Sequence, residues 1–184
     1  MTVVTQAGIR MTDDGTLSES DWDVLAAVPF AVFLLVAYAD GRLAPAERRA
    51  FAGIVDGIGT RARSADEALV REVMGRISRD PGRIKERLDA QVVAGLPVYE
   101  VFAAARSLLD DRLQRGVAQA FKEAMVHLAE EVARAWPILG RRTSVEEARS
   151  IDFIRDQLGL QDHKVIDPEP ATQTTTAGTT TGAG

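Results

Sequence analysis

An uncharged run of 16 residues, 24–39 (VLAAVPFAVFLLVAYA), limits the folds that are open to this chain. A helix that spans a bilayer needs about 20 apolar residues, and this run is shorter and contains Pro29. An export signal needs a positively charged start, whereas the preceding residues carry one basic residue, Arg10, against five acidic ones. The run therefore predicts a buried central helix, no membrane insertion and a cytoplasmic protein.

The two ends of the chain differ in composition from the part between them. Residues 163–184 are rich in threonine, glycine and proline and contain no aromatic residue, so they cannot bury enough surface to offset the entropy lost on ordering. Residues 1–17 have no sustained apolar period and include a turn signal, Asp13-Asp14-Gly15. We predict a flexible leader over 1–17, one folded domain over 18–162 and a disordered tail over 163–184.

Between these ends, apolar residues recur at spacings of three and four, which is the period of helices that bury one face. The first helix is expected to begin after Ser20, with Asp23 completing its cap, and Ser64-x-x-Glu67 is a capping box for the third. The expected helices cover about 21–39, 45–58, 64–77, 82–93, 98–110, 113–136 and 144–158. The pattern predicts an all-α fold, a single compact bundle of about seven helices.

Two parts of this pattern resemble each other at a shift of 100 residues. The matched pairs are Glu47 with Glu147, Arg49 with Arg149, Phe51 with Ile151, Ile54 with Ile154, Ile58 with Leu158, and Gly59 with Gly159. Residues 36–39 also match 132–135, at a shift of 96. A matched cap, apolar stripe and stop predict two helix–loop–helix hairpins of one design, each burying one apolar face.

Composition excludes several kinds of chemistry. The chain has no cysteine, which rules out disulfides, thiolate zinc sites, iron–sulfur ligation and a thiol nucleophile. It has only two histidines, which leaves little for a histidine metal site. A formal charge of −5 argues against nucleic acid as a partner, because binding to phosphates needs a basic surface.

The stretch VAYADGRLAPAERRAFAGIVDGIG (36–59) resembles the first signature of the TerB-like family, named for tellurite resistance. In that signature an A-D-G turn is followed, six residues after its glycine, by the glutamate that opens a helix, and Asp40, Gly41 and Glu47 occupy these places. The stretches FKEAMVHLAEEVARA and SVEEARSIDFIRDQLGL are similar to the family's second half, except that Trp136-Pro137 stands where the fuller pattern has Asp-Gly. The resemblance implies a helical bundle with an acidic surface, a cytoplasmic setting and a role in metal-ion or stress response.

Asp40 and Glu47 are the candidate metal ligands, and a divalent cation is the one cofactor we expect. Calcium and magnesium bind carboxylate and carbonyl oxygens, which a connection between helices can supply. The stretch 40–47 has only two acidic side chains, so water or other residues would have to complete such a site. In the alternative interpretation, Asp40-Gly41 is a turn and Glu47 accepts a hydrogen bond from a free amide in the first turn of its helix.

Three classes of function remain open. The one we prefer is a non-catalytic helical module that binds a divalent cation, or a protein partner through its helical surface. The second is a small metal-dependent hydrolase with clustered carboxylates, which requires a polar pocket where Glu130, Asp40 and His127 converge. The third is a structural adaptor, which requires an exposed apolar patch of more than a few hundred Å². Adjacent acidic residues such as Asp110-Asp111 point about 100° apart on a helix and do not form a paired-carboxylate site by themselves.

Overall fold

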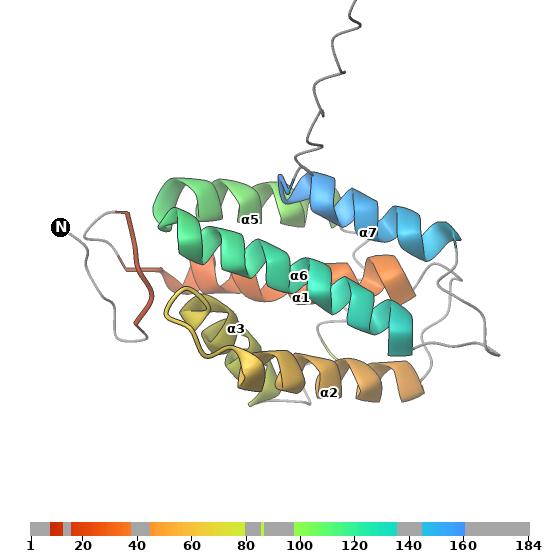
Figure 1. Ribbon diagram of the computed structural model, residues 1–184. Helices are drawn as coiled ribbons and strands as arrows, with labels where there is room; N and C mark the ends of the chain where they lie inside the picture. The colour runs from red at the N-terminus through yellow and green to blue at the C-terminus, as the bar shows by residue number, and fades with distance from the viewer. Residues whose placement is uncertain are drawn as a thin grey trace, which may run out of the picture.

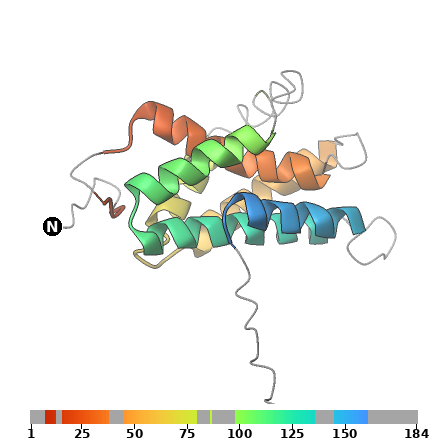
Figure 2. The same ribbon diagram turned by 90° about the horizontal axis from the view of Figure 1, so that it is seen from above.

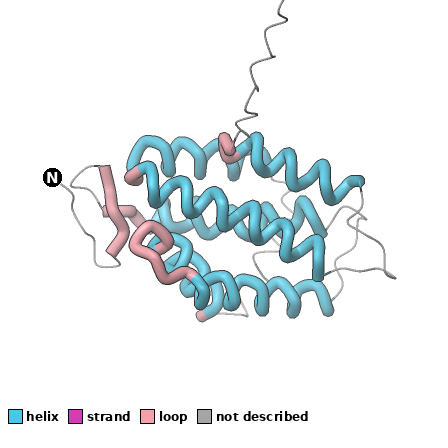
Figure 3. The backbone as a smooth tube through the Cα atoms, in the orientation of Figure 1, coloured by secondary structure: helices cyan, strands magenta, loops and turns pink. Residues whose placement is uncertain are grey.

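Six α-helices lie within the residues that the computed structural model describes, which are 8–12, 16–37, 45–79, 86, 98–135 and 145–160 (Figure 1 and Figure 3). The helices are α1 (Glu19–Ala37), α2 (Pro45–Arg61), α3 (Ala68–Ser78), α5 (Val98–Arg112), α6 (Arg115–Ala135) and α7 (Val145–Gln157). They confirm the all-α class. The helix predicted over 82–93 lies outside the described residues, apart from Glu86, which is helical.

Helix α1 lies at the centre of the bundle, and each of the other five described helices packs against it (Figure 2). Its residues Leu25, Val28, Val32 and Phe33 are fully buried. The helix is long and apolar enough to cross a membrane, but 56% of its apolar window is buried inside the protein. The prediction of a buried central helix is confirmed, and the lack of charge follows because protein surrounds the helix on several sides.

The start of α1 is capped by Ser18 and Asp21, two residues before the predicted pair, Ser20 and Asp23. The Ser18 N–H donates to Asp21 Oδ2 at 2.8 Å, and the Asp21 N–H donates to Ser18 Oγ at 3.2 Å. Burial opposes ionisation of Asp21, but the hydrogen bonds from Ser18 and the nearby Arg112 guanidinium lower its pKa overall. The predicted start was wrong by two residues because both pairs have the spacing of a capping box.

The hydrogen-bond pair predicted for the capping box Ser64-x-x-Glu67 is present, but α3 begins at Ala68 and not directly after Ser64, with Glu67 as its N-cap residue. Glu67 Oε2 accepts a hydrogen bond from the Ser64 N–H at 2.8 Å, and the Glu67 N–H donates to Ser64 Oγ at 3.2 Å. Gly59, in contrast, is not the predicted stop, because α2 continues to Arg61. A Cβ on Gly59 would lie 2.8 Å from Cβ of Met74 in α3, so the glycine allows these two helices to approach closely.

The two helices at the C-terminal end of the fold follow the prediction closely. The apolar stripe of α6 faces the core, with five members 1% exposed or less: Val117, Phe121, Met125, Leu128 and Val132. Trp136, the last predicted member, lies outside the described residues. Helix α7 is followed by Gly159 at a φ of 71°, a left-handed conformation that favours glycine after a helix.

Residues 8–12 belong to the fold, which corrects the prediction of a flexible leader over 1–17 for this stretch. Ile9 and Met11 are each 1% exposed and are part of the core. Met11 also pairs with Leu113, between α5 and α6, in an isolated antiparallel β-bridge. Two apolar residues at a spacing of two are too short a pattern to indicate a strand in the sequence.

Candidate functional site

The two predicted metal ligands, Asp40 and Glu47, lie in or beside the connection between α1 and α2. Asp40 is in 38–44, outside the described residues. Glu47 is the third residue of α2, and its backbone is helical, while its side chain is outside the described part of the chain. A carboxylate in the first turn of a helix is favoured by the positive end of the helix dipole. Because Asp40 and the side chain of Glu47 lie outside the described residues, the pairing of Asp40 with Glu47 stays a prediction.

Elsewhere, the described residues contain no group of three or more histidine, aspartate or glutamate side chains placed to hold a metal ion. His163, the second histidine of the chain, lies outside the described residues. Of the three residues that a hydrolase would bring together, the structure describes the side chains of His127 and Glu130. Both belong to α6 and line one groove.

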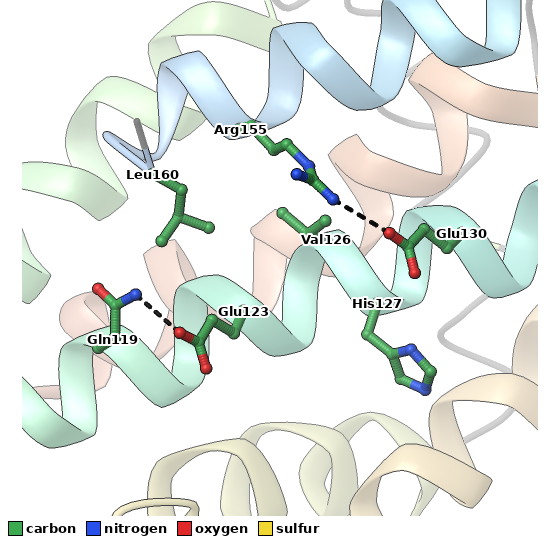
Figure 4. Close-up of a pocket in the computed structure, with 7 residues that line it drawn as sticks. All are labelled: Gln119, Glu123, Val126, His127, Glu130, Arg155 and Leu160. Carbon is green, nitrogen blue, oxygen red and sulfur yellow. Dashed lines mark hydrogen bonds and ion pairs between the residues drawn. The ribbon is translucent and has the colours of Figure 1, made fainter. Parts of the chain in front are cut away.

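This groove lies between α6 and α7 and has a volume of about 300 Å³ (Figure 4). Its lining combines polar side chains with two aliphatic ones: Gln119, Glu123, Val126, His127, Glu130, Arg155 and Leu160. The Gln119 amide nitrogen donates to Glu123 Oε1 at 2.8 Å. The groove is thus a mixed polar and apolar surface formed by neighbouring turns of α6 and the end of α7.

Both oxygens of the Glu130 carboxylate have arginine partners. Arg155 Nη2 lies 3.2 Å from Oε1, and Arg134 Nη2 lies 3.4 Å from Oε2. In Figure 4 the Glu130 carboxylate points toward Arg155, whereas the His127 ring points away from this arginine. Glu130 therefore joins α6 to α7 by an ion pair, and a metal ion or substrate would have to displace a guanidinium to reach it.

His127 has a different carboxylate partner, Glu131. The His127 Nε2 lies 3.3 Å from Glu131 Oε1, and Arg61 of α2 lies 3.5 Å from the same oxygen. The imidazole is directed at the side of α6 that faces α2, so His127 and Glu130 line one groove without facing each other. The convergence that a hydrolase requires is not formed by these two side chains.

A second pocket, of about 360 Å³, lies between α5 and α7 and contains the acidic pair Asp110-Asp111. The two carboxylates have separate partners, since Asp110 pairs with Lys122 and Arg106, while Asp111 accepts a hydrogen bond from the Ser107 hydroxyl at 2.8 Å. This agrees with the expectation that adjacent acidic residues on a helix do not form a paired-carboxylate site by themselves.

Lys122, which the sequence did not single out, lies only 7% exposed on the apolar side of α6. Its Nζ is 2.5 Å from Asp110 Oδ1 on α5. The available signal was its position directly after Phe121 in the predicted stripe, where a charged side chain reaches the core and needs a partner.

The large apolar side chains that are exposed among the described residues are Tyr99, Val145 and Phe153, at 58%, 63% and 38%. Tyr99 lies at the start of α5, and the other two lie eight residues apart on α7. Single exposed apolar residues are normal on a protein surface, so they do not by themselves indicate an adaptor.

Comparisons with protein-family models, with curated proteins and with solved structures found no match to this chain. The resemblance to the TerB-like family therefore rests on the motifs around Asp40 and Glu47 and on the related stretches near the end of the domain.

Proposed function

We propose that this chain is a non-catalytic helical module of the TerB-like kind, which binds a divalent cation at Asp40 and Glu47. Its role is to bind a protein partner through its helical surface in a cytoplasmic metal or stress response. In this proposal the two hairpins, α1 with α2 and α6 with α7, are copies of one design. The second copy has lost the site, because Trp136-Pro137 replaces the Asp-Gly pair.

The observation that carries this proposal is the position of Asp40 and Glu47 in the sequence relative to α1 and α2. Helix α1 ends at Ala37 and α2 begins at Pro45, so Glu47 belongs to the first turn of α2 and Asp40 to the connection before it. Both residues therefore fall within ten residues of the end of α1 in the sequence. A connection of this kind supplies carboxylate and backbone carbonyl oxygens, the ligands that hard divalent cations prefer.

The ion pairs of α6 favour a non-catalytic module over a hydrolase. Glu130 is held by Arg134 and Arg155, and Glu131 is held by Arg61 and His127. A general acid or base must be free to exchange a proton with a substrate within hydrogen-bond distance. Side chains that join α6 to its neighbours through ion pairs are better suited to holding the bundle together.

A thermal melt of the full chain, with and without calcium, magnesium, manganese or zinc, tests the metal site. A cation at 100 times its dissociation constant adds about 2.7 kcal/mol of stability, which for a domain of this size raises the melting temperature by roughly 5 to 10 °C. We expect one of these cations to produce such a shift in the wild type. The double variant Asp40→Ala/Glu47→Ala is expected to lose it while keeping its helical circular dichroism spectrum.

Glu147→Ala provides the matched control, because Glu147 occupies the place of Glu47 in the second hairpin. This variant should keep the metal response of the wild type. The proposal is wrong if no cation shifts the wild-type melt, which would leave Asp40 and Glu47 as a turn and a helix cap. It is also wrong if the shift survives in the double variant, since the ion would then bind elsewhere.

A further inference from the structure

Residues 8–12 lie against one end of the bundle in an extended arrangement with alternating exposure (Figure 1). The side chains of Ile9 and Met11 are directed into the core and are each 1% exposed. Arg10, between them, is only partly buried, and Thr12 is exposed. This period of two is the pattern of a β-strand with one buried face, although the rest of the described fold is helical.

The backbone of this segment pairs with the corner between α5 and α6. The Thr12 N–H donates to the Arg112 carbonyl at 3.0 Å, and the Gln114 N–H donates to the Arg10 carbonyl at 3.2 Å. Helix ends leave carbonyl and amide groups without partners inside the helix, and a strand supplies both a donor and an acceptor for them. The corner thus offers a short strand edge at Arg112, Leu113 and Gln114.

The side chains of the segment also contact specific partners. Arg10 Nη1 lies 3.2 Å from Asp66 Oδ1, in the turn between α2 and α3. The Thr12 hydroxyl donates to the Asp111 carbonyl at 3.2 Å. The covered surface, which we call the strand-docking surface, therefore consists of Asp66, the main chain of 111–114 and the core positions that receive Ile9 and Met11. The segment that occupies it has the order apolar, basic, apolar, hydroxyl.

We propose that the strand-docking surface is a peptide-binding site, which the chain fills with its own residues 8–12 and from which a partner protein's extended segment of the same order displaces them. Addition of a strand to an exposed edge is a common mode of peptide recognition, in which the main chain supplies affinity and alternate side chains supply specificity. The Arg10–Asp66 pair gives the site its charge preference, for a basic residue between two apolar ones. This proposal is independent of the metal site at Asp40 and Glu47.

The site can be tested with a fluorescent peptide of residues 6–13 (QAGIRMTD) and the full-length chain. In the double variant Ile9→Ser/Met11→Ser, the chain's own segment no longer fills the apolar positions, so the variant should bind the peptide in a fluorescence anisotropy titration. The wild type should bind it at least about 100-fold more weakly, because its own segment competes at a high effective concentration. A peptide with the same two serines is the control and should not bind, and Asp66→Asn in the variant chain should weaken binding.

A disulfide lock gives a second, independent measurement. Met11 and Leu113 are flanked by the two backbone hydrogen bonds on either side, so they form a non-hydrogen-bonded antiparallel pair. The Cα atoms of such a pair lie about 4.5 Å apart, which is within the range that disulfides bridge. The chain has no cysteine, so Met11→Cys/Leu113→Cys introduces a single thiol pair. When oxidised, this variant should exclude the peptide, and when reduced it should bind the peptide at least about tenfold more tightly.

Three results would overturn the proposal. One is a folded Ile9→Ser/Met11→Ser variant, judged by its circular dichroism spectrum, that does not bind the wild-type peptide. If that variant does not fold, the Met11→Cys/Leu113→Cys variant provides the test. Equal peptide binding by the oxidised and reduced forms of this cysteine variant would contradict the proposal. The third is a disulfide between two chains in place of one within a chain, which would identify a second copy as the occupant of the surface.

Discussion

Gly59 of α2 lies against Met74 of α3 so closely that a Cβ on the glycine would be 2.8 Å from Cβ of the methionine. Met74 belongs to the apolar stripe of α3, in which Leu69, Val73 and Met74 are fully buried. Because the neighbouring atom is attached directly to the α3 backbone, the clash can be relieved only if the helices move apart. The small size of Gly59 therefore sets the distance between α2 and α3.

Substitution of Gly59 by alanine should destabilise the protein by about 1–3 kcal/mol, the usual cost of overpacking a core. Gly53 is the matched control, because it lies in the same helix with nothing within 4 Å of its would-be Cβ. Gly53→Ala should stabilise the protein by about 0.5–1 kcal/mol, the difference in helix propensity. Urea unfolding of the two variants measures both effects, and a stabilising Gly59→Ala would show that the two helices adjust freely.

The Lys122–Asp110 pair predicts an asymmetric response to mutation. Asp110→Ala leaves the buried ammonium of Lys122 without this partner and should cost on the order of 1–3 kcal/mol. Lys122→Met removes the charge together with its need for a partner and should be close to neutral. Chemical denaturation of the two single variants and the double variant gives the coupling energy. Equal losses in both single variants would contradict this interpretation.

The capping box before α3 predicts a loss of stability in acid. Hydrogen bonds from the backbone and hydroxyl of Ser64 lower the pKa of Glu67 below its ordinary value of 4.5. Ionised Glu67 therefore stabilises the folded state above pH 4.5, and this contribution disappears as the pH falls through the lowered pKa of the folded state. Ser64→Ala should raise the pKa of Glu67, which an NMR titration of the glutamate carboxyl carbon measures directly.

Glu67→Gln is the control for this pH dependence. Its stability relative to the wild type should be lower at pH 7, and the difference should shrink as the pH is lowered below 4.5 and Glu67 becomes protonated in both states. A difference between the two proteins that stays constant from pH 7 to pH 2 would mean that the charge of Glu67 contributes nothing to the cap.

Phe51 and Ile151, which are matched positions of the predicted hairpins, are expected to differ in their contribution to stability. Phe51 is fully buried, with its ring centroid 4.5 Å from that of Phe33 and 5.5 Å from that of Phe30. Ile151 is only partly buried against the core. Phe51→Ala should cost about 3–5 kcal/mol, and Ile151→Ala clearly less. Thermal unfolding of both variants checks this, and equal losses would favour hairpins packed in the same way.

The helices were predictable because their signals are local. Apolar spacing and the Ser64–Glu67 cap predict α3, and the stripe from Val117 to Val132 predicts α6, without knowledge of the tertiary contacts. The role of Gly59 was not predictable in this way. Gly59 and Gly159 look like equivalent stops in the sequence, but the first is inside a helix against Met74 and the second follows a helix at positive φ.

The candidate sites depend on contacts between distant parts of the chain, and these have weak local signals. The ion pair between Lys122 and Asp110 joins α6 to α5, and the pair between Arg155 and Glu130 joins α7 to α6. From the sequence alone, Asp110 and Glu130 could equally be acidic side chains that are exposed to solvent. Ile9 and Met11 likewise become core residues only because the corner at Leu113 receives them.

The central position of α1 has a consequence for synthesis of the protein. Its principal packing partners, α5 and α6, come later in the chain, and the end of α6 at Ala135 follows the end of α1 at Ala37 by 98 residues. At about 5–20 residues per second, the ribosome takes roughly 5–20 s to make that stretch. During this interval the uncharged part of α1, residues 24–37, is made before α5 and α6, so the nascent chain exposes an apolar surface that the finished protein buries.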